Sequence, residues 1–205
     1  LGPEEVKATK QRLGWPDAPA FYIPDEALAR FREAIGKGQK AEAEWQEKLA
    51  AYAEKFPAEA NELDDLTRGK LPPGWDAAIP DFPADAKGMA TRVASGKILN
   101  AVAPRLPTLI GGSADLNPST HTALAKLGDF ESSRNDFTKS QGAAGGGFNF
   151  AGRNLHFGVR EHAMGAAASG MALSGLRPFA ASFFVFTDYA RGAIRLAAMM
   201  GLPVI

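Results

Sequence analysis

The stretch NLHFGVREHAMGAAASGMALSG, residues 154–175, decides the fold of this chain and raises its functional question. It opens with an apolar run typical of a buried strand. It continues into a segment built mostly of alanine and glycine, which predicts a helix whose backbone packs closely against a neighbour. Arg160, Glu161 and His162 lie at the junction of the two segments. Charged residues avoid such a junction unless they are solvated, paired or functional.

Strand-like and helical patterns alternate on both sides of this stretch. Strands are predicted over 107–113, 154–159, 177–186 and 202–205, and helices over 90–106, 160–175 and 187–201, the last with Thr187 as its cap. This alternation predicts an α/β fold, a parallel sheet flanked by helices. Ligands of such sheets bind at the carboxyl ends of the strands, where Glu161, Ser113 and Asp115 fall.

The first half of the chain is charged and helical in pattern. Helices are predicted from Pro3 to a stop at Gly14, from an Asp25 cap to Gly36, and over 39–56, and Pro57 can begin another. The third helix carries an apolar stripe of Trp45, Leu49, Tyr52 and Phe56. Residues 70–83 are rich in proline and predict an extended linker. We therefore predict a helical tail plus linker over 1–86 and an α/β domain over 87–205, within a longer polypeptide.

The composition narrows the class of partner. Lys and Arg number 23, as do Asp and Glu, so a formal charge of zero gives no reason to expect nucleic acid or an anionic membrane. No apolar run approaches the roughly 20 residues of a spanning helix, and no secretory signal stands at the start. The absence of cysteine fits a reducing compartment, and the predicted location is the cytoplasm.

Glu161 has two interpretations. In the first, a carboxylate in the first turn of a helix is stabilised by the helix dipole and paired with Arg160 or a lysine. In the second, a carboxylate at the ligand edge of the sheet, beside a buried small-residue helix, is an acid/base group. A similar choice applies to Phe183, Phe186 and Tyr189, which are either core residues or a stacking platform for a flat ring.

The other motifs are weaker evidence for a ligand site. In GGSADLNPST (residues 111–120) two glycines could turn the backbone toward a ligand, or Asp115 could satisfy backbone donors. Arg92 would by default be a surface charge. The three histidines do not have metal-ligand spacing, so hydrogen-bonded or solvated histidine is favoured for each. The segment 140–154 predicts a mobile surface loop, and its glycines match no P-loop or dinucleotide fingerprint.

In combination, the motifs GGSADLNPS, HFGVREHAMGAAASGMALSG, FAASFFVFTDYARGAIRLAAMM and MATRVASGKILN resemble transketolase in order and spacing. The resemblance extends over nearly the whole chain, including LGWPDAPAFYIPDEA in the first half. It implies a thiamine diphosphate enzyme of the pentose phosphate pathway that moves a two-carbon ketol unit between sugar phosphates.

The resemblance also assigns residues. Glu161 matches the glutamate that bonds N1′ of the cofactor's aminopyrimidine and so favours removal of the thiazolium C2 proton. Phe183, Phe186 and Tyr189 match the aromatic pocket around the pyrimidine, and Asp115 matches a residue that lines the cofactor site near the subunit interface. Arg92 and Ser119 match residues that hold the sugar's terminal phosphate, a task suited to a guanidinium and a hydroxyl.

The departures bear on what the chain can do alone. The family's Gly-Asp-Gly motif, with its downstream asparagine for the diphosphate and a divalent metal (Mg or Ca), does not occur. The family's proton-transfer histidines are also missing. No metal ligands are therefore assigned, and the chain is expected to hold half of a pocket that a homodimer completes. Two alternatives stay open: another thiamine diphosphate enzyme such as a phosphoketolase, and a non-catalytic α/β binding module.

Overall fold

The computed structural model describes residues 2–85, 87–135 and 142–205, and the chain forms two units, Leu1–Ala60 and Asn61–Ile205. The first unit holds helices α1 (Pro3–Arg12) and α2 (Asp25–Lys55). Helix α1 has acidic residues in its first turn and basic residues in its last, and Gly14 follows it with a φ of 65°. This order of charges suits the helix dipole, and the predicted stop at Gly14 is confirmed.

The predicted end of a helix at Gly36 is wrong. Helix α2 begins at Asp25, whose preceding residue Pro24 takes the cap position, and runs without a break to Lys55. A helical glycine costs about 1 kcal/mol relative to alanine, and the alanine, glutamate and lysine residues on both sides offset that cost. Pro57 begins helix α3 (Pro57–Thr67), as predicted. Within the described residues no helix is long and apolar enough to cross a membrane.

The second unit contains a parallel sheet, and the predicted α/β class is confirmed. Its strands are β1 (Leu109–Ser113), β2 (Asp129–Phe130), β3 (Phe148–Asn149), β4 (Asn154–His156) and β5 (Arg177–Ala181), in the order β3-β2-β4-β1-β5. In the register, Gly111 of β1 lies between Asn154 of β4 and Phe179 of β5. Strand β1 therefore sets the register of both of its neighbours, β4 and β5.

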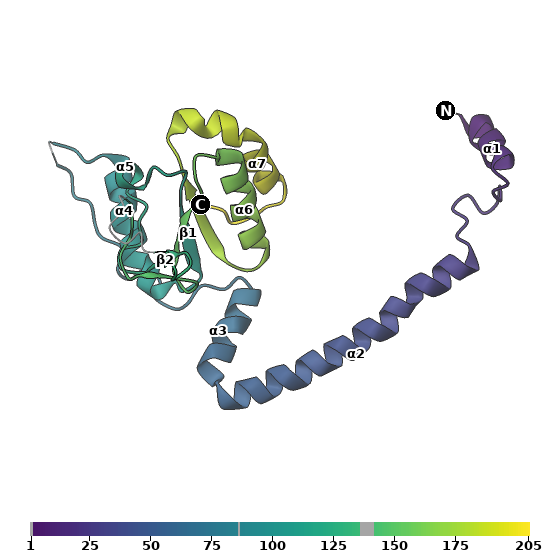
Figure 1. The fold of residues 1–205 in the computed structure, drawn as a ribbon, viewed down its shortest axis with the longest axis horizontal. Coiled ribbons are helices and arrows are strands. Elements are labelled where there is room, and N and C mark those ends of the chain that lie inside the picture. Colours follow the sequence, from purple (N-terminus) through teal and green to yellow (C-terminus); the bar gives the residue numbers. More distant parts are fainter. Residues whose placement is uncertain (1, 86, 136–141) are drawn as a thin grey trace. The chain divides into compact units, whose positions relative to one another are not determined.

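Helices cover both faces of this sheet. They are α4 (Thr91–Val102), η1 (Ala103–Arg105), α5 (Asn117–Thr120), α6 (Glu161–Leu173), η2 (Phe184–Phe186) and α7 (Thr187–Met199). Helix α4 lies on one side of β1, and α6 and α7 lie together on the other (Figure 1). A Cβ on Gly165 of α6 would lie 2.8 Å from the Cβ of Ala193 in α7. The close packing predicted for the small-residue helix is confirmed.

The core of this unit gathers around the α4 side of the sheet. Its buried members are Val102, Ala103, Leu106, Leu109, Leu124 and Phe179. Trp75 packs against them from the proline-rich segment, which contains no helix or strand from Lys70 to Pro83. Arg153, just before β4, donates from Nη1 and Nη2 to the carbonyls of Leu106 and Ala103 at 2.7 Å. Burial lowers the pKa of this guanidinium, whose bonds join β4 to the end of α4.

The two glycines of β1 do not form a ligand-binding turn. Gly111 and Gly112 lie inside the strand, and a Cβ on either would stand 2.0 Å from the carbonyl oxygen of Phe179 or Leu155. The interpretation of this pair as a turn after the strand is therefore wrong. Because these glycines have no side chain, the backbones of the neighbouring strands β5 and β4 can approach β1 closely.

Two predicted strands and one predicted helix cap also differ from the structure. The strand predicted over 177–186 ends at Ala181, and Phe184–Phe186 forms the 3-10 helix η2. Thr187 is not a cap, because its Oγ1 donates to the Phe184 carbonyl at 2.7 Å. Residues 202–205 form no strand, although Ile205 exchanges two backbone hydrogen bonds with Pro178 and Ala180 of β5.

The long segment between β1 and β4 holds the short strands β2 and β3, which the sequence did not predict. Part of the predicted mobile loop, residues 140–141, lies outside the described residues. The described part that follows is hydrogen-bonded to the rest of the unit. The backbone amides of Lys126 and Gly128 donate to the carbonyls of Ala144 and Gly145 at 2.9 Å.

Candidate active site

The candidate site lies at the carboxyl edge of the parallel sheet. Strands β1, β4 and β5 run in the same direction, so the residues that follow their last positions meet at one edge. Those residues include Asp115, Glu161 and Ser182, each from a different connection. The predicted placement of Glu161 and Asp115 at this edge is confirmed.

Glu161 is the first residue of α6, and only 5% of it is exposed. Its Oε1 accepts a hydrogen bond of 2.9 Å from the Ser182 hydroxyl. Among the described residues it makes no ion pair, and the guanidinium of Arg160 lies instead against Gly158. Pairing with Arg160 therefore does not explain the buried carboxylate, although the helix dipole still favours it.

The second oxygen of Glu161 is open. No other hydrogen bond to this carboxylate occurs among the described residues, and none of their fully buried polar atoms lacks a partner. Oε2 is therefore unpaired and not completely buried, although the residue as a whole is buried, and we call it the open oxygen. A buried carboxylate with one fixed and one open oxygen can bind or hold a proton of a ligand at this edge.

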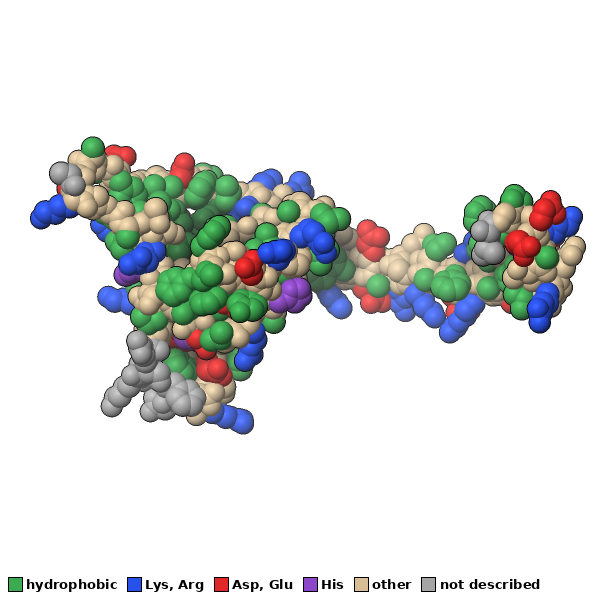
Figure 2. Space-filling model, turned by 90° about the horizontal axis from the view of Figure 1, so that it is seen from above, with side chains coloured by type: hydrophobic (Ala, Val, Ile, Leu, Met, Phe, Trp, Pro, Cys, Tyr) green, Lys and Arg blue, Asp and Glu red, His purple; other side chains and the backbone are tan. Residues whose placement is uncertain are grey.

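Aromatic side chains follow Ser182 along the chain. The ring centroids of Phe183 and Phe186 lie 6.3 Å apart, and those of Phe186 and Tyr189 are also 6.3 Å apart, with tilted planes. Phe183 is 40% exposed and Tyr189 is 68% exposed. The face drawn in Figure 2 shows groups of exposed apolar side chains on the sheet-containing unit. This exposure contradicts the interpretation of Phe183 and Tyr189 as core residues, whereas Phe186 between them is half-buried. The two exposed rings are available to pack against a ligand.

A cavity of about 390 Å³ joins this aromatic run to helix α4. Arg92 and Ser95 line it from α4, and Ser182 and Phe183 line it from the connection after β5. Within the described part of the chain Arg92 is exposed and makes no ion pair. Its guanidinium is therefore free to donate hydrogen bonds to an anionic group of a ligand in this cavity.

The structure separates the two remaining predicted residues from this cavity. Asp115 is exposed, has a φ of 57°, and lines a neighbouring cavity of about 300 Å³ with Ser113, Asn117 and His156. Ser119 is exposed in α5 and lines neither cavity, whereas the adjacent Thr120 lines the one with Arg92. Arg92, Phe183 and, through Ser182, Glu161 are thus brought together, and Ser119 is not.

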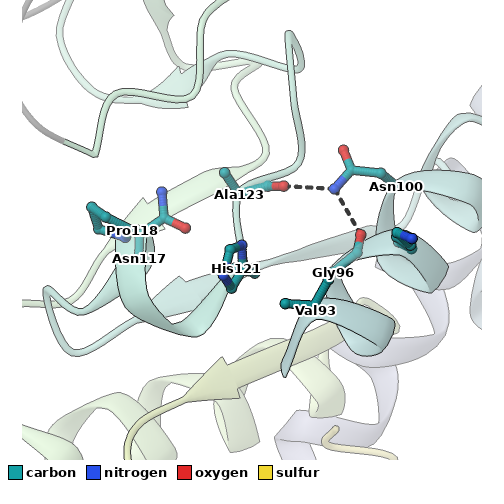
Figure 3. Close-up of a pocket in the computed structure, with 8 residues that line it drawn as sticks. Val93, Gly96, Asn100, Asn117, Pro118, His121 and Ala123 are labelled. Carbon is teal, nitrogen blue, oxygen red and sulfur yellow. Dashed lines mark hydrogen bonds between the residues drawn. The ribbon is translucent and has the colours of Figure 1, made fainter. Parts of the chain in front are cut away.

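A third cavity, of about 410 Å³, lies between α4 and α5. Figure 3 shows His121 beside Gly96, with Asn100 bonded to the carbonyls of Gly96 and Ala123. Asn100 Oδ1 also accepts from the Ala125 amide at 2.8 Å. The Asn100 side chain therefore bonds α4, the helix that carries Arg92, to the segment that follows α5.

Two polar contacts at this edge of the sheet escaped the sequence analysis. Ser182 carried no separate signal there, although it directly precedes the aromatic run. Asp129, with 1% of its side chain exposed, accepts from the Ala144 amide and lies 2.8 Å from His156 Nε2. His156 is therefore hydrogen-bonded, as predicted. Among the described residues no group of three or more His, Cys, Asp or Glu could hold a metal ion.

Comparison with known proteins decides the family. Residues 87–205 match the family model for the transketolase pyrimidine binding domain, and residues 1–72 match that for the transketolase thiamine diphosphate binding domain. The chain belongs to the transketolase family. Transketolase from Geobacillus stearothermophilus is 47% identical over all of this chain and 29% of its own length, and Bacillus subtilis transketolase is 43% identical over 28% of its length.

Solved structures agree with this family assignment. A transketolase variant from Pichia stipitis in complex with fructose-6-phosphate has a TM-score of 0.81 and 36% identity, over 100% of this chain and 29% of that one. Transketolase from Leishmania mexicana gives a TM-score of 0.80 and 37% identity, over 99% and 28%. The chain thus spans less than a third of the length of these transketolase relatives.

Proposed function

We propose that this chain carries the pyrimidine-binding half of a transketolase active site. The complete enzyme would transfer a two-carbon ketol unit between ketose and aldose phosphates. The single observation that carries the proposal is the buried Glu161 carboxylate with one open oxygen, at the ligand edge of the sheet, linked by Ser182 to an exposed aromatic run. The family membership supports the same activity.

The described residues fit one half of thiamine diphosphate. Glu161 would hydrogen-bond N1′ of the aminopyrimidine through its open oxygen and hold the proton there. Phe183, Phe186 and Tyr189 would pack on the ring, and Asp115 would line the site near the subunit interface. When bound, the cofactor supplies the means to stabilise a carbanion on the two-carbon unit, and the protein supplies orientation and proton control. The diphosphate and its divalent metal would take ligands from other parts of the enzyme.

The substrate's terminal phosphate would bind Arg92. Ser119, which the resemblance also assigns to this phosphate, lies outside the cavity of Arg92 and would reach the phosphate only from the neighbouring helix α5. Support comes from the unpaired state of Arg92 in its cavity among the described residues. Related Pichia stipitis transketolases have been solved in complex with fructose-6-phosphate and with sedoheptulose-7-phosphate. Sugar phosphates are therefore the proposed substrates.

Replacement of Arg92 by alanine should raise KM for phosphorylated sugars by about 10-fold to 150-fold, the range for a lost charge-assisted hydrogen bond of about 1.5–3 kcal/mol. KM for unphosphorylated acceptors should change much less. Steady-state kinetics with a matched pair of acceptors that differ only in the phosphate would measure this. Arg191→Ala is the control, because Arg191 is also exposed but pairs with Asp188. Equal effects of Arg92→Ala on both acceptors would refute the phosphate role.

The chain on its own is expected to have negligible affinity for thiamine diphosphate, because the residues described offer no cluster for its metal. Isothermal titration calorimetry with magnesium present would test this, and the complete enzyme serves as the positive control. Tight binding to the 205-residue chain would show that it holds more of the cofactor site than proposed.

The remaining features belong to the same proposal. We further propose a domain division between residues 86 and 87, a homodimer that completes the site, a role in the pentose phosphate pathway and a cytoplasmic location, with the match to the transketolase family as the support. The absence of cysteine agrees with a reducing compartment.

A further inference from the structure

Among the described serines of this unit, Ser182 differs in what its hydroxyl bonds. Ser169 and Ser174 each donate to a backbone carbonyl four residues earlier in α6 or at its end. Ser182 donates instead to the carboxylate of Glu161, which lies 21 residues away in the sequence. This bond joins the connection after β5 to the first turn of α6.

The bond controls a torsion that the chain otherwise leaves loose. The last torsion of a glutamate is broad and roughly two-fold, so the packing around the stem does not fix the plane of the carboxylate. A hydrogen bond to an ionised acceptor is stronger than one between neutral groups. At 2.9 Å, Ser182 holds Oε1, and among the described residues Oε2 has no hydrogen-bond partner.

The position of Ser182 ties this orientation to the rest of the site. Ser182 and Phe183 line the same cavity as Arg92, so one short segment touches the carboxylate, the aromatic run and the cavity of the guanidinium. Ser182 is half-buried, which limits how well water can replace its hydroxyl. Catalytic geometry needs a supporting shell to hold it within about 0.5 Å and 10–20°.

We propose that Ser182 is a positioning residue that fixes the Glu161 carboxylate plane, so that Oε2 meets the aminopyrimidine ring of the cofactor. This inference rests on the proposed function. It predicts that the Ser182 hydroxyl affects the chemical step and the environment of the bound ring. It further predicts that this hydroxyl has little influence on sugar binding or on the stability of the fold.

The test uses the complete enzyme that contains this segment, as Ser182→Ala, Ser182→Thr and Ser169→Ala. Ser182→Ala should lower kcat by about tenfold, within the range for a misplaced catalytic group, and leave KM for the sugar phosphates within about twofold. Ser182→Thr keeps the hydroxyl and should retain kcat within about threefold. Ser169→Ala removes a hydroxyl bonded only to backbone and should match the wild type.

A second measurement does not depend on turnover. The near-ultraviolet circular dichroism of bound thiamine diphosphate should change in Ser182→Ala but not in Ser182→Thr or Ser169→Ala, because only the first alters the ring's partner. Thermal unfolding should be similar in all three. Wild-type kcat and dichroism in Ser182→Ala would overturn the inference. So would a loss of kcat in Ser182→Ala that is matched by Ser169→Ala or that follows a fall in the unfolding midpoint.

One further variant separates this inference from the proposed function. If Glu161→Gln lowers kcat and Ser182→Ala does not, the inference is wrong and the proposed function stands. If Glu161→Gln has wild-type kcat, the proposed function itself is wrong.

Discussion

Replacement of Glu161 by alanine in the complete enzyme is expected to lower kcat by about 10²–10⁴-fold, the range for the loss of an acid/base group. The structural reason is that Glu161 is 5% exposed and has one fixed and one open oxygen at the ligand edge of the sheet. Steady-state kinetics at saturating cofactor would measure the change. Glu161→Gln is the companion variant, because glutamine has the shape of glutamate without its charge.

Asp188→Ala is the matched control for this prediction. Asp188 lies in the first turn of α7 as Glu161 does in the first turn of α6, but its side chain is 71% exposed and paired with Arg191. If the role of Glu161 were only to complement a helix dipole, both variants would lose at most about 1 kcal/mol of stability and little activity. Near-wild-type turnover of Glu161→Ala would remove this residue from the mechanism and favour a non-catalytic module.

Replacement of Gly112 by alanine should destabilise the sheet by about 3 kcal/mol or more, at the upper end of the range for overpacking. The new Cβ would stand 2.0 Å from the Leu155 carbonyl oxygen, which belongs to a neighbouring strand and cannot move independently. The thermal unfolding midpoint and the yield of soluble protein would report the effect.

Gly170→Ala supplies the opposite case within the same unit. Gly170 lies in α6 with nothing within 4 Å of its added Cβ. There alanine should stabilise by about 0.5–1 kcal/mol, because it restricts the unfolded chain and favours the helix. If Gly112→Ala were as stable as Gly170→Ala, close strand contact would not be the reason for glycine in β1.

The sequence predicted the sheet because its strands and helices alternate in long, distinct patterns. The sequence-based prediction failed where the same residues are compatible with two local structures. The run Phe183 to Phe186 is apolar in a strand and in a 3-10 helix alike, and the structure adopts the helix. Gly36 marks a helix end only when the flanking residues are weak helix formers, and here they are strong. Strands β2 and β3 have two residues each, too short to show a period.

The sequence could predict which residue types form the site and at which strand ends they lie. Glu161 and Arg92 could be selected because a carboxylate at a strand end and a basic residue on a neighbouring helix have recognisable roles. The bond from Ser182 to Glu161 could not, because it depends on the register of β5 against β1 and on a side-chain torsion. Contacts of that kind arise only when elements distant in sequence are packed together.

The position of β1 between β4 and β5 has a consequence for how the chain is made. Both neighbours of this strand are synthesised after it, and roughly 40 residues separate the end of β1 from the start of β4. At about 5–20 residues per second, the edges of β1 stay without partners for several seconds on the ribosome. Apolar strand edges exposed for that time are a hazard for aggregation. Biogenesis of this domain is therefore expected to depend on chaperones that shield the nascent strand until its partners emerge.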